Sequence, residues 1–323
     1  MDRRSFLAAA ALACAALLPA PILAADGYPS KPVKILFGFP PASATDFIAR
    51  TVGEKLSQKW GQPVVIDNRP GAGGNLGTAM AAKEPKDGYT IFFGTVANAI
   101  STTYYSKLDY DYLKDFTPVT LVATTPLVLV VNKDLPVKNV KDLIDYAKAH
   151  PGEVNFGSGG PGTSNHLTGE LFNAVTGTKM THVPYKGTPA AYTDLISGRI
   201  QVMFDNIASG TPQIKAGTLR AIAVTSPKRA PSLPDVPTVS ETLPGFEALS
   251  WIAALVPAGT PKDVVAKLHK DITDVLNMKD VQEKLATQGA IAQPTTPEQL
   301  DKWNRDEIAK WAKAIQAAGV KGD

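Results

Sequence analysis

The sequence predicts an α/β protein of two lobes with a cleft between them. Three observations support this prediction. From Val33 onward short β-branched runs alternate with helical patterns, which is typical of βαβ units. The chain also looks as if it crosses between lobes twice, and three polar or glycine-rich loops each follow a strand. A length of 323 residues suits two domains of ordinary size.

The composition is that of a folded soluble protein. The chain has 33 Lys and Arg against 30 Asp and Glu, a formal net charge of +3, 44% hydrophobic and 20% charged residues. These values exclude a disordered or collagen-like chain. The charge is too small, and its Lys and Arg too dispersed, for a nucleic-acid surface. We therefore expect no nucleic-acid partner.

The first 25 residues are predicted to be an export signal. Arg3 and Arg4 precede an uncharged run rich in Ala and Leu, and small residues follow at Ala24 and Ala25. Cleavage is expected after Ala24 or Ala25. The alternative is a membrane anchor, which the Ala-rich composition and two prolines near the end of the run disfavour. The paired arginines leave both the twin-arginine and the general secretory route open.

The single cysteine, Cys14, lies inside this segment. The mature chain would then have no cysteine. That excludes disulfides, thiolate catalysis and zinc bound by cysteine.

The first lobe begins with a buried strand over 33–39 and a helix that Thr45 or Asp46 caps. Ile48, Val52 and Leu56 fall four residues apart on one face of this helix. Because strands and helices alternate, we expect mostly parallel sheets. Further strands are predicted at 63–66, 89–93, 119–122, 127–131, 154–156, 202–204 and 219–224, and helices at 140–149, 163–175, 189–197, 261–276 and 297–318.

Two extended stretches, 124–127 and 247–257, are predicted to carry the chain between the lobes. The first lobe would then hold residues 26–124 plus 249–323, and the second lobe residues 125–248. Two neighbouring crossings make a double hinge near Thr125 and Ser250. The helix at 297–318 is expected to pack on the first lobe.

Three loops stand where a strand hands over to a helix, at 40–46, 71–75 and 157–164. Free N–H groups and the positive end of a helix dipole make such turns anion sites, although each alone could be a tight turn. Since all three are predicted at the carboxyl ends of parallel strands, a shared cleft is favoured.

Catalytic and cofactor motifs are poorly represented. Gly157, Gly159 and Gly162 fit a dinucleotide fingerprint, but no acidic residue ends the next strand, and 71–77 lacks the lysine of a phosphate loop. The four histidines lack metal-ligand spacing, and no serine lies in a nucleophile elbow. We expect no cofactor, no metal and no catalytic residue.

The sequence leaves two interpretations open for each of two polar sites. His166, on the first turn of a helix, would contact a ligand or serve in capping and packing. The pair Asp205 and Asn206, directly after the strand at 202–204, would recognise an ammonium or hydroxyl group or cap the helix that begins at Ile207.

The ordered motifs resemble the Bug-type substrate-binding proteins of tripartite tricarboxylate transporters. They span essentially the whole mature chain: YPSKPV at 28–33, the Pro-Pro turn that ends in Thr45 and Asp46, VIDNRPGAGGN at 65–75, DGYT at 87–90, HVPYKG at 182–187, LPDVPT at 233–238 after Arg229, and PAGTP at 257–261. The resemblance implies the type II-like, two-lobed fold of periplasmic binding proteins, closing on a small organic acid.

The resemblance also implies a set of ligand-binding residues. In the first lobe these are Phe39, Pro41, Ala42, Ser43, Thr45, Asp46, Asn75 and Thr95, and across the cleft Gly160, Thr163, Ser164, His166, Tyr185 and Asp205. The chain departs from the family at Ala42 and Ser43, where Gly-Gly is usual. Their Cβ atoms are expected to restrict positive φ angles and the approach of a carboxylate.

The function that this resemblance implies is a non-enzymatic periplasmic receptor, expected to be a monomer. It would bind a carboxylated small molecule and deliver it to a membrane permease. Two alternatives stay open: an enzyme acting on an organic acid on the same scaffold, and a receptor that feeds a sensor kinase.

Overall fold

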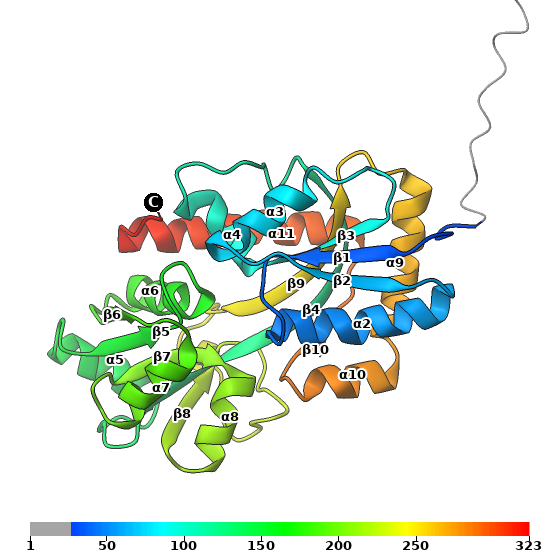
Figure 1. Ribbon diagram of the computed structural model, residues 1–323. Helices are drawn as coiled ribbons and strands as arrows, with labels where there is room; N and C mark the ends of the chain where they lie inside the picture. The colour runs from blue at the N-terminus through cyan, green and yellow to red at the C-terminus, as the bar shows by residue number, and fades with distance from the viewer. Residues whose placement is uncertain (1–26, 323) are drawn as a thin grey trace, which may run out of the picture.

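The computed structural model describes residues 27–322, so the predicted export signal lies outside the described residues. Within this part of the chain, no helix is long and apolar enough to cross a membrane. Strands run through both lobes as one sheet in the order β2-β1-β3-β9-β4-β7-β5-β6, with β8 and β10 also paired to β4. Figure 1 shows the lobes one above the other.

The first lobe is built on three parallel strands, with β1 between β2 and β3. Its elements are β1 (Val33–Phe37), α2 (Ala44–Trp60), β2 (Val64–Asn68), η2 (Ala72–Gly74), α3 (Asn75–Ala81), β3 (Thr90–Thr95), α4 (Val96–Tyr104), α9 (Lys262–Leu276), α10 (Lys279–Ala286) and β10 (Ile291–Ala292). Alternation along β1 sends Ile35 and Phe37 into a core shared with α2 and α9, while Leu36 faces the opposite core.

Two long antiparallel strands join the lobes: β4 (Phe116–Asn132) and β9 (Leu249–Pro257). Thr125 pairs directly with Ser250, and the pairing with β9 ends at Pro126. From Leu127 onward β4 pairs with strands of the second lobe. The chain thus passes between lobes on two adjacent strands.

The second lobe repeats the parallel plan, with β5 between β6 and β7. Its elements are α5 (Val140–Ala149), β5 (Asn155–Ser158), α6 (Ser164–Thr176), β6 (Thr181–Pro184), α7 (Thr188–Ile196), β7 (Val202–Asn206), α8 (Ile207–Lys215), β8 (Leu219–Val224) and η3 (Val239–Glu241). The final helix, α11 (Pro297–Ala318), packs against both α4 and α6, so it touches both lobes. One hydrophobic core accordingly runs from Tyr104 through Trp311 to Phe172.

Three sequence expectations about the fold need correction. The sheet is mixed rather than mostly parallel, because β4 and β9 pair antiparallel with their neighbours. The strands expected at 119–122 and 127–131 are one strand, β4. Ser43, rather than Thr45 or Asp46, caps α2, because its Oγ accepts the N–H of Asp46 at 3.2 Å.

Candidate functional site

The N-terminus of α2 offers the clearest anion-binding donors of the first lobe. Ser43 is the N-cap residue, so the N–H groups of Ala44 and Thr45 have no acceptor within the helix. Pro41 and Ala42 are exposed beside them, whereas Thr45 is buried. The dipole of this 17-residue helix adds partial positive charge at the same point.

Asp46 organises this loop from within. Its carboxylate accepts the N–H of Ala42 at 3.0 Å, the Nε of Arg50 at 2.9 Å and the Nδ2 of Asn68 at 3.0 Å. The hydrogen bond from Arg50 is the largest influence on the pKa of Asp46 and holds it below its ordinary value, against the effect of burial. With the side chain only 4% exposed, Asp46 shapes the loop as an ionised acceptor.

Ala42 adopts a left-handed backbone in spite of its Cβ, with φ of 62°. The Cβ of Ala42 therefore does not prevent a positive φ, although glycine would adopt this φ at lower cost. The hydrogen bond from Ala42 N–H to Asp46 holds the turn in place. It also occupies the Ala42 N–H, which leaves Ala44, Thr45 and the Ser43 hydroxyl as donors to a ligand.

The loop at 71–75 follows β2 and carries four successive positive φ angles, from Gly71 at 146° to Gly74 at 99°. Gly74 is pressed against the first loop, because a Cβ on Gly38 would lie 2.4 Å from the Gly74 carbonyl oxygen. The ring of Phe39 packs 3.5 Å from the place of a Gly74 Cβ. Asn75 accepts the Tyr110 hydroxyl at 2.6 Å through Oδ1.

Thr95 ends β3 and caps α4. Its Oγ1 accepts the N–H of Ala97 at 3.3 Å, while Asn98 accepts the N–H of Thr95 at 2.8 Å. Thr95 is 5% exposed, so it is a buried capping residue. Its hydroxyl can also donate one hydrogen bond. The turns after β1, β2 and β3 all lie at one edge of the parallel strands.

In the second lobe the loop at 157–164 folds around the carbonyl of Gly160. That oxygen accepts the hydroxyls of Ser158 at 3.1 Å and Thr163 at 2.7 Å. Thr163 is the N-cap of α6, and Ser164 is its first helical residue. The N–H groups of the first turn of α6 are therefore available at this edge, as those of α2 are in the first lobe.

Two stacked histidines support this loop from beneath. The rings of His166 and His182 lie 3.8 Å apart, the Nδ1 of His166 accepts the N–H of Gly162 at 3.1 Å, and the Nε2 of His182 lies 2.6 Å from Ser158 Oγ. Burial, with a smaller contribution from His166, lowers the pKa of His182 to about 3. His166 is 2% exposed, and its buried Nε2 has no hydrogen-bond partner, although Glu170 Oε1 lies 3.6 Å away.

Asp205 is fully buried at the end of β7, with 0% exposure. One carboxylate oxygen accepts the Nδ2 of Asn165 at 2.9 Å and the other accepts the Tyr192 hydroxyl at 2.5 Å. Burial raises the pKa of Asp205 above its ordinary value. The helix-cap interpretation holds only for position, because Asn206 occupies the N-cap of α8 but neither its side chain nor that of Asp205 caps the helix.

Tyr185 follows β6, and its hydroxyl donates to Asp194 at 2.8 Å. Burial raises the pKa of Tyr185 to about 12. The hydroxyl of Tyr185 therefore points to α7, and only its half-buried ring remains for contact with other groups. The predicted residues of the second lobe gather at the carboxyl ends of β5, β6 and β7, which are parallel neighbours.

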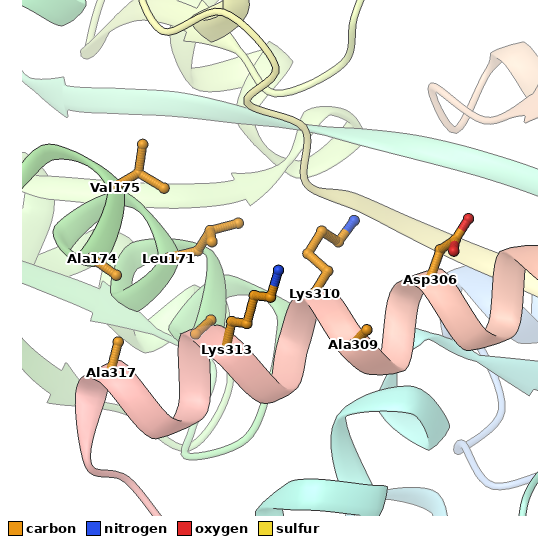
Figure 2. A pocket seen from close by; sticks show the side chains of 9 residues that line it. Leu171, Ala174, Val175, Asp306, Ala309, Lys310, Lys313 and Ala317 are labelled. Carbon is orange, nitrogen blue, oxygen red and sulfur yellow. The ribbon is translucent and has the colours of Figure 1, made fainter.

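A different hollow lies between α6 and α11 and has a volume of about 520 Å³ (Figure 2). Leu171 and Val175 line it from α6, and alanines with Lys310 and Lys313 line it from α11. No residue of the predicted site lies among its lining residues. Its lining is mostly small and apolar, Lys310 already pairs with Glu307, and Asp306 adds a negative charge, so the loops make the better candidate site for a carboxylate.

The fold and the loops correspond to one known family. Residues 48–320 match the family described as "Tripartite tricarboxylate transporter family receptor". The chain belongs to this receptor family. The protein BugT of Bordetella pertussis is 38% identical to this receptor over 94% of either chain.

Solved structures give the same result. A Rhodopseudomonas palustris protein, Rpa4515 with adipate, is 38% identical with a TM-score of 0.79, covering 91% of this receptor and 99% of that chain. MatC from the same organism, with bound malate, is 31% identical with a TM-score of 0.75, covering 89% of this receptor and 100% of that chain. The two-lobed fold of periplasmic binding proteins is thereby confirmed.

Sequence reasoning missed the residues that support the loops. Asn68 and Asn165 hold the two aspartates, Tyr192 bonds Asp205, and His182 with Ser158 underlies the glycine loop. The motifs at 65–75 and 182–187 contain Asn68 and His182, but nothing in one sequence says which residues they meet. Asn165 and Tyr192 carry no signal beyond their helical setting.

The Ser158 and His182 pair has the separation of an activated hydroxyl. Ser158 is nevertheless 0% exposed, and its Oγ also accepts the N–H of Gly160 at 3.1 Å. A substrate carbonyl cannot reach that oxygen in this conformation. Among residues 27–322, no group of three or more His, Cys, Asp and Glu side chains could hold a metal.

Proposed function

We propose that this receptor binds a small carboxylate between its lobes without chemical turnover and delivers it to the permease of a tripartite tricarboxylate-type transporter. The observation that carries this proposal is the pair of helix N-termini, α2 and α6, each opening at the carboxyl edge of the parallel strands of its lobe. In the first lobe the donors would be the N–H groups of Ala44 and Thr45 and the Ser43 hydroxyl. The N–H groups at the start of α6, with Ser164, would serve the other end of the ligand.

The remaining predicted residues would act at the edges of the same site. Phe39 and Pro41 would supply apolar surface. Asn75 would donate through its amide nitrogen, because its Oδ1 already accepts the Tyr110 hydroxyl. Gly160 would keep the second loop close to the ligand. Asp46, Thr95 and Thr163 would shape the loops that present the donors, because the side chain of each already accepts a hydrogen bond within the protein. His166 would support the second loop through its Nδ1, which accepts the Gly162 N–H, while its buried Nε2 has no hydrogen-bond partner.

The ligand is proposed to be a dicarboxylate or a hydroxylated monocarboxylate. Relatives with adipate and with malate, both of which are dicarboxylates, support the first of these two classes. Asp205 would select against a second carboxylate if it were ionised, and would favour a hydroxyl or an amine. Because burial raises the pKa of Asp205, this penalty is smaller than the sequence alone suggested.

Ligand binding is proposed to bend the molecule where Thr125 of β4 pairs with Ser250 of β9. The lobes would be residues 26–124 plus 249–323 and residues 125–248, as predicted. Small-angle scattering should show a smaller radius of gyration with ligand. An unchanged radius with a demonstrated ligand would contradict closure about these strands.

Residues 1–25 are proposed to direct the chain to the periplasm and to be removed there. N-terminal sequencing of the mature protein should begin at Ala25 or Asp26, whereas an intact N-terminus would contradict cleavage. Light scattering should give a monomeric mass.

The direct test of the function is a thermal-shift screen of mono- and dicarboxylates, followed by calorimetry. A ligand at a hundred times its Kd should add about 2.7 kcal/mol to the free energy of unfolding. Recovery of the ligand unchanged after long incubation separates a receptor from an enzyme. A carboxylate that is consumed, or a full panel without any shift, would contradict the proposal.

A further inference from the structure

Two adjacent tyrosines at the end of α4 meet the two glycine-rich loops. A Cβ on Gly162, in the second lobe, would lie 3.1 Å from the Tyr104 ring. A Cβ on Gly73, in the first lobe, would lie 3.2 Å from the Tyr105 hydroxyl oxygen. The two rings pack edge to face with centroids 5.2 Å apart. One short segment of chain therefore contacts both loops of the candidate site.

The C-terminal segment holds this tyrosine pair in place. The N–H of Gly322 donates to the carbonyl of Tyr104 at 2.7 Å, and Gly322 forms a parallel bridge with Tyr105. A Cβ on Gly322 would lie 2.5 Å from Cε1 of Tyr104 and 2.9 Å from Cδ1 of Tyr105. Only glycine fits here without moving a ring, and Tyr104 is itself 5% exposed.

The contact matters because parts of both loops are exposed. Gly71, Ala72 and Gly73 are exposed, and Pro161 is exposed at the tip of the second loop. Exposed glycine-rich loops open easily, and ordering them on binding costs affinity. A ring fixed against each loop restricts it before the ligand arrives.

We propose that Tyr104 and Tyr105 are positioning residues, each of which orders one of the two ligand loops before the ligand binds, and that Gly322 locks both rings. This inference rests on the proposed function for the identity of the loops. It predicts that a change at the C-terminus, outside the candidate site, alters both loops together.

Amide hydrogen exchange of the ligand-free protein tests the proposal without knowledge of the ligand. In Gly322→Ala, exchange should rise about tenfold in both 71–75 and 157–163, with the core strands unchanged. Lys321→Ala, at the exposed neighbouring position, is the control and should match the wild type. In Tyr105→Leu, only 71–75 should exchange faster, which keeps the test decisive should Gly322→Ala fold poorly.

A second arm measures the Kd for adipate as the probe. It should rise about tenfold in Gly322→Ala, and stay unchanged in Lys321→Ala. Adipate that binds to neither the wild type nor a variant would count against the proposed ligand class, while the exchange data would still decide the role of the tyrosines. Unchanged exchange in both loops of Gly322→Ala, or a uniform rise across the whole protein, would overturn the proposal.

Discussion

The candidate ligand loops of the two lobes, at 40–46 and 157–164, begin alike, at a helix N-terminus after a parallel strand, but different chemistry holds them. In the first lobe the ionised carboxylate of Asp46 gathers N–H donors into the loop. In the second lobe the neutral imidazole of His182, which stacks on His166, and the buried Asp205 support the loop from below. The first loop is thus held by a carboxylate whose pKa is lowered, whereas the second rests on His182 and Asp205, whose pKa values burial shifts against the charged form.

The largest expected effect comes from removing the carboxylate of Asp46. Asp46→Ala leaves the Ala42 N–H and the Asn68 amide without their acceptor, so the free energy of unfolding should fall by about 3 kcal/mol. Denaturant unfolding measures this change. Arg50→Ala is the matched control, because Arg50 is exposed and its ion pair should contribute less than about 1 kcal/mol. Equal losses in the two variants would show that the charge pair, not the loop network, matters.

The next effect is a pH dependence confined to the second lobe. The pKa of His182 is about 3 in the folded protein against an ordinary 6.5, so the unfolded chain binds a proton first as pH falls. The contribution of His182 to the free energy of unfolding is therefore complete above pH 6.5. It declines by about 1.4 kcal/mol per pH unit as the pH falls toward 3. Between pH 6.5 and 5 the wild type should lose about 2 kcal/mol more than His182→Gln. Parallel pH profiles would contradict the buried, neutral imidazole.

A smaller effect separates capping from ligand binding at Ser43. Ser43→Ala should lower the free energy of unfolding by about 1 kcal/mol, because the Asp46 N–H loses its acceptor. Ser43→Gly should cost only a few tenths of a kcal/mol. Both variants should weaken carboxylate binding by about 1.5–3 kcal/mol if the hydroxyl donates to the ligand. Calorimetry that finds unchanged affinity in both would place Ser43 in a capping role alone.

The smallest effect concerns the left-handed Ala42. Ala42→Gly should raise the free energy of unfolding by up to about 1 kcal/mol, because glycine adopts this φ without steric cost. Thermal unfolding measures the gain. Affinity should change little, since the Ala42 N–H already bonds Asp46. A loss of stability would mean that the turn is less strained than its φ indicates.

Much of the fold could be predicted because its patterns are local. The helices at 140–149 and 297–318 and the strand at 219–224 are confirmed at the predicted bounds, since periodicity and capping lie within each segment. The antiparallel β4 could not be predicted as one strand, because Pro126 interrupts a run whose continuity comes from β9 on one side and β7 on the other.

The candidate site also has parts that the sequence predicts and parts that it does not. Three loops, at 40–46, 71–75 and 157–164, contain glycine, proline and capping residues, which predict a turn before a helix. The partners of those loops come from tertiary packing: His166 and His182 lie on different elements, as do Asp205 and Tyr192. No spacing rule joins such pairs, so the sequence predicts where a ligand would bind better than it predicts what shapes the site.

The central claim is that the first loop captures a carboxylate through the N-terminus of α2. A crystal structure grown with the carboxylate that gives the largest thermal shift tests it most directly. The account predicts a carboxylate oxygen within about 2.7–3.2 Å of the N–H of Ala44 or Thr45, with the opposite end of the ligand at the start of α6. A ligand bound instead in the hollow between α6 and α11, with the N-terminus of α2 untouched, would contradict it.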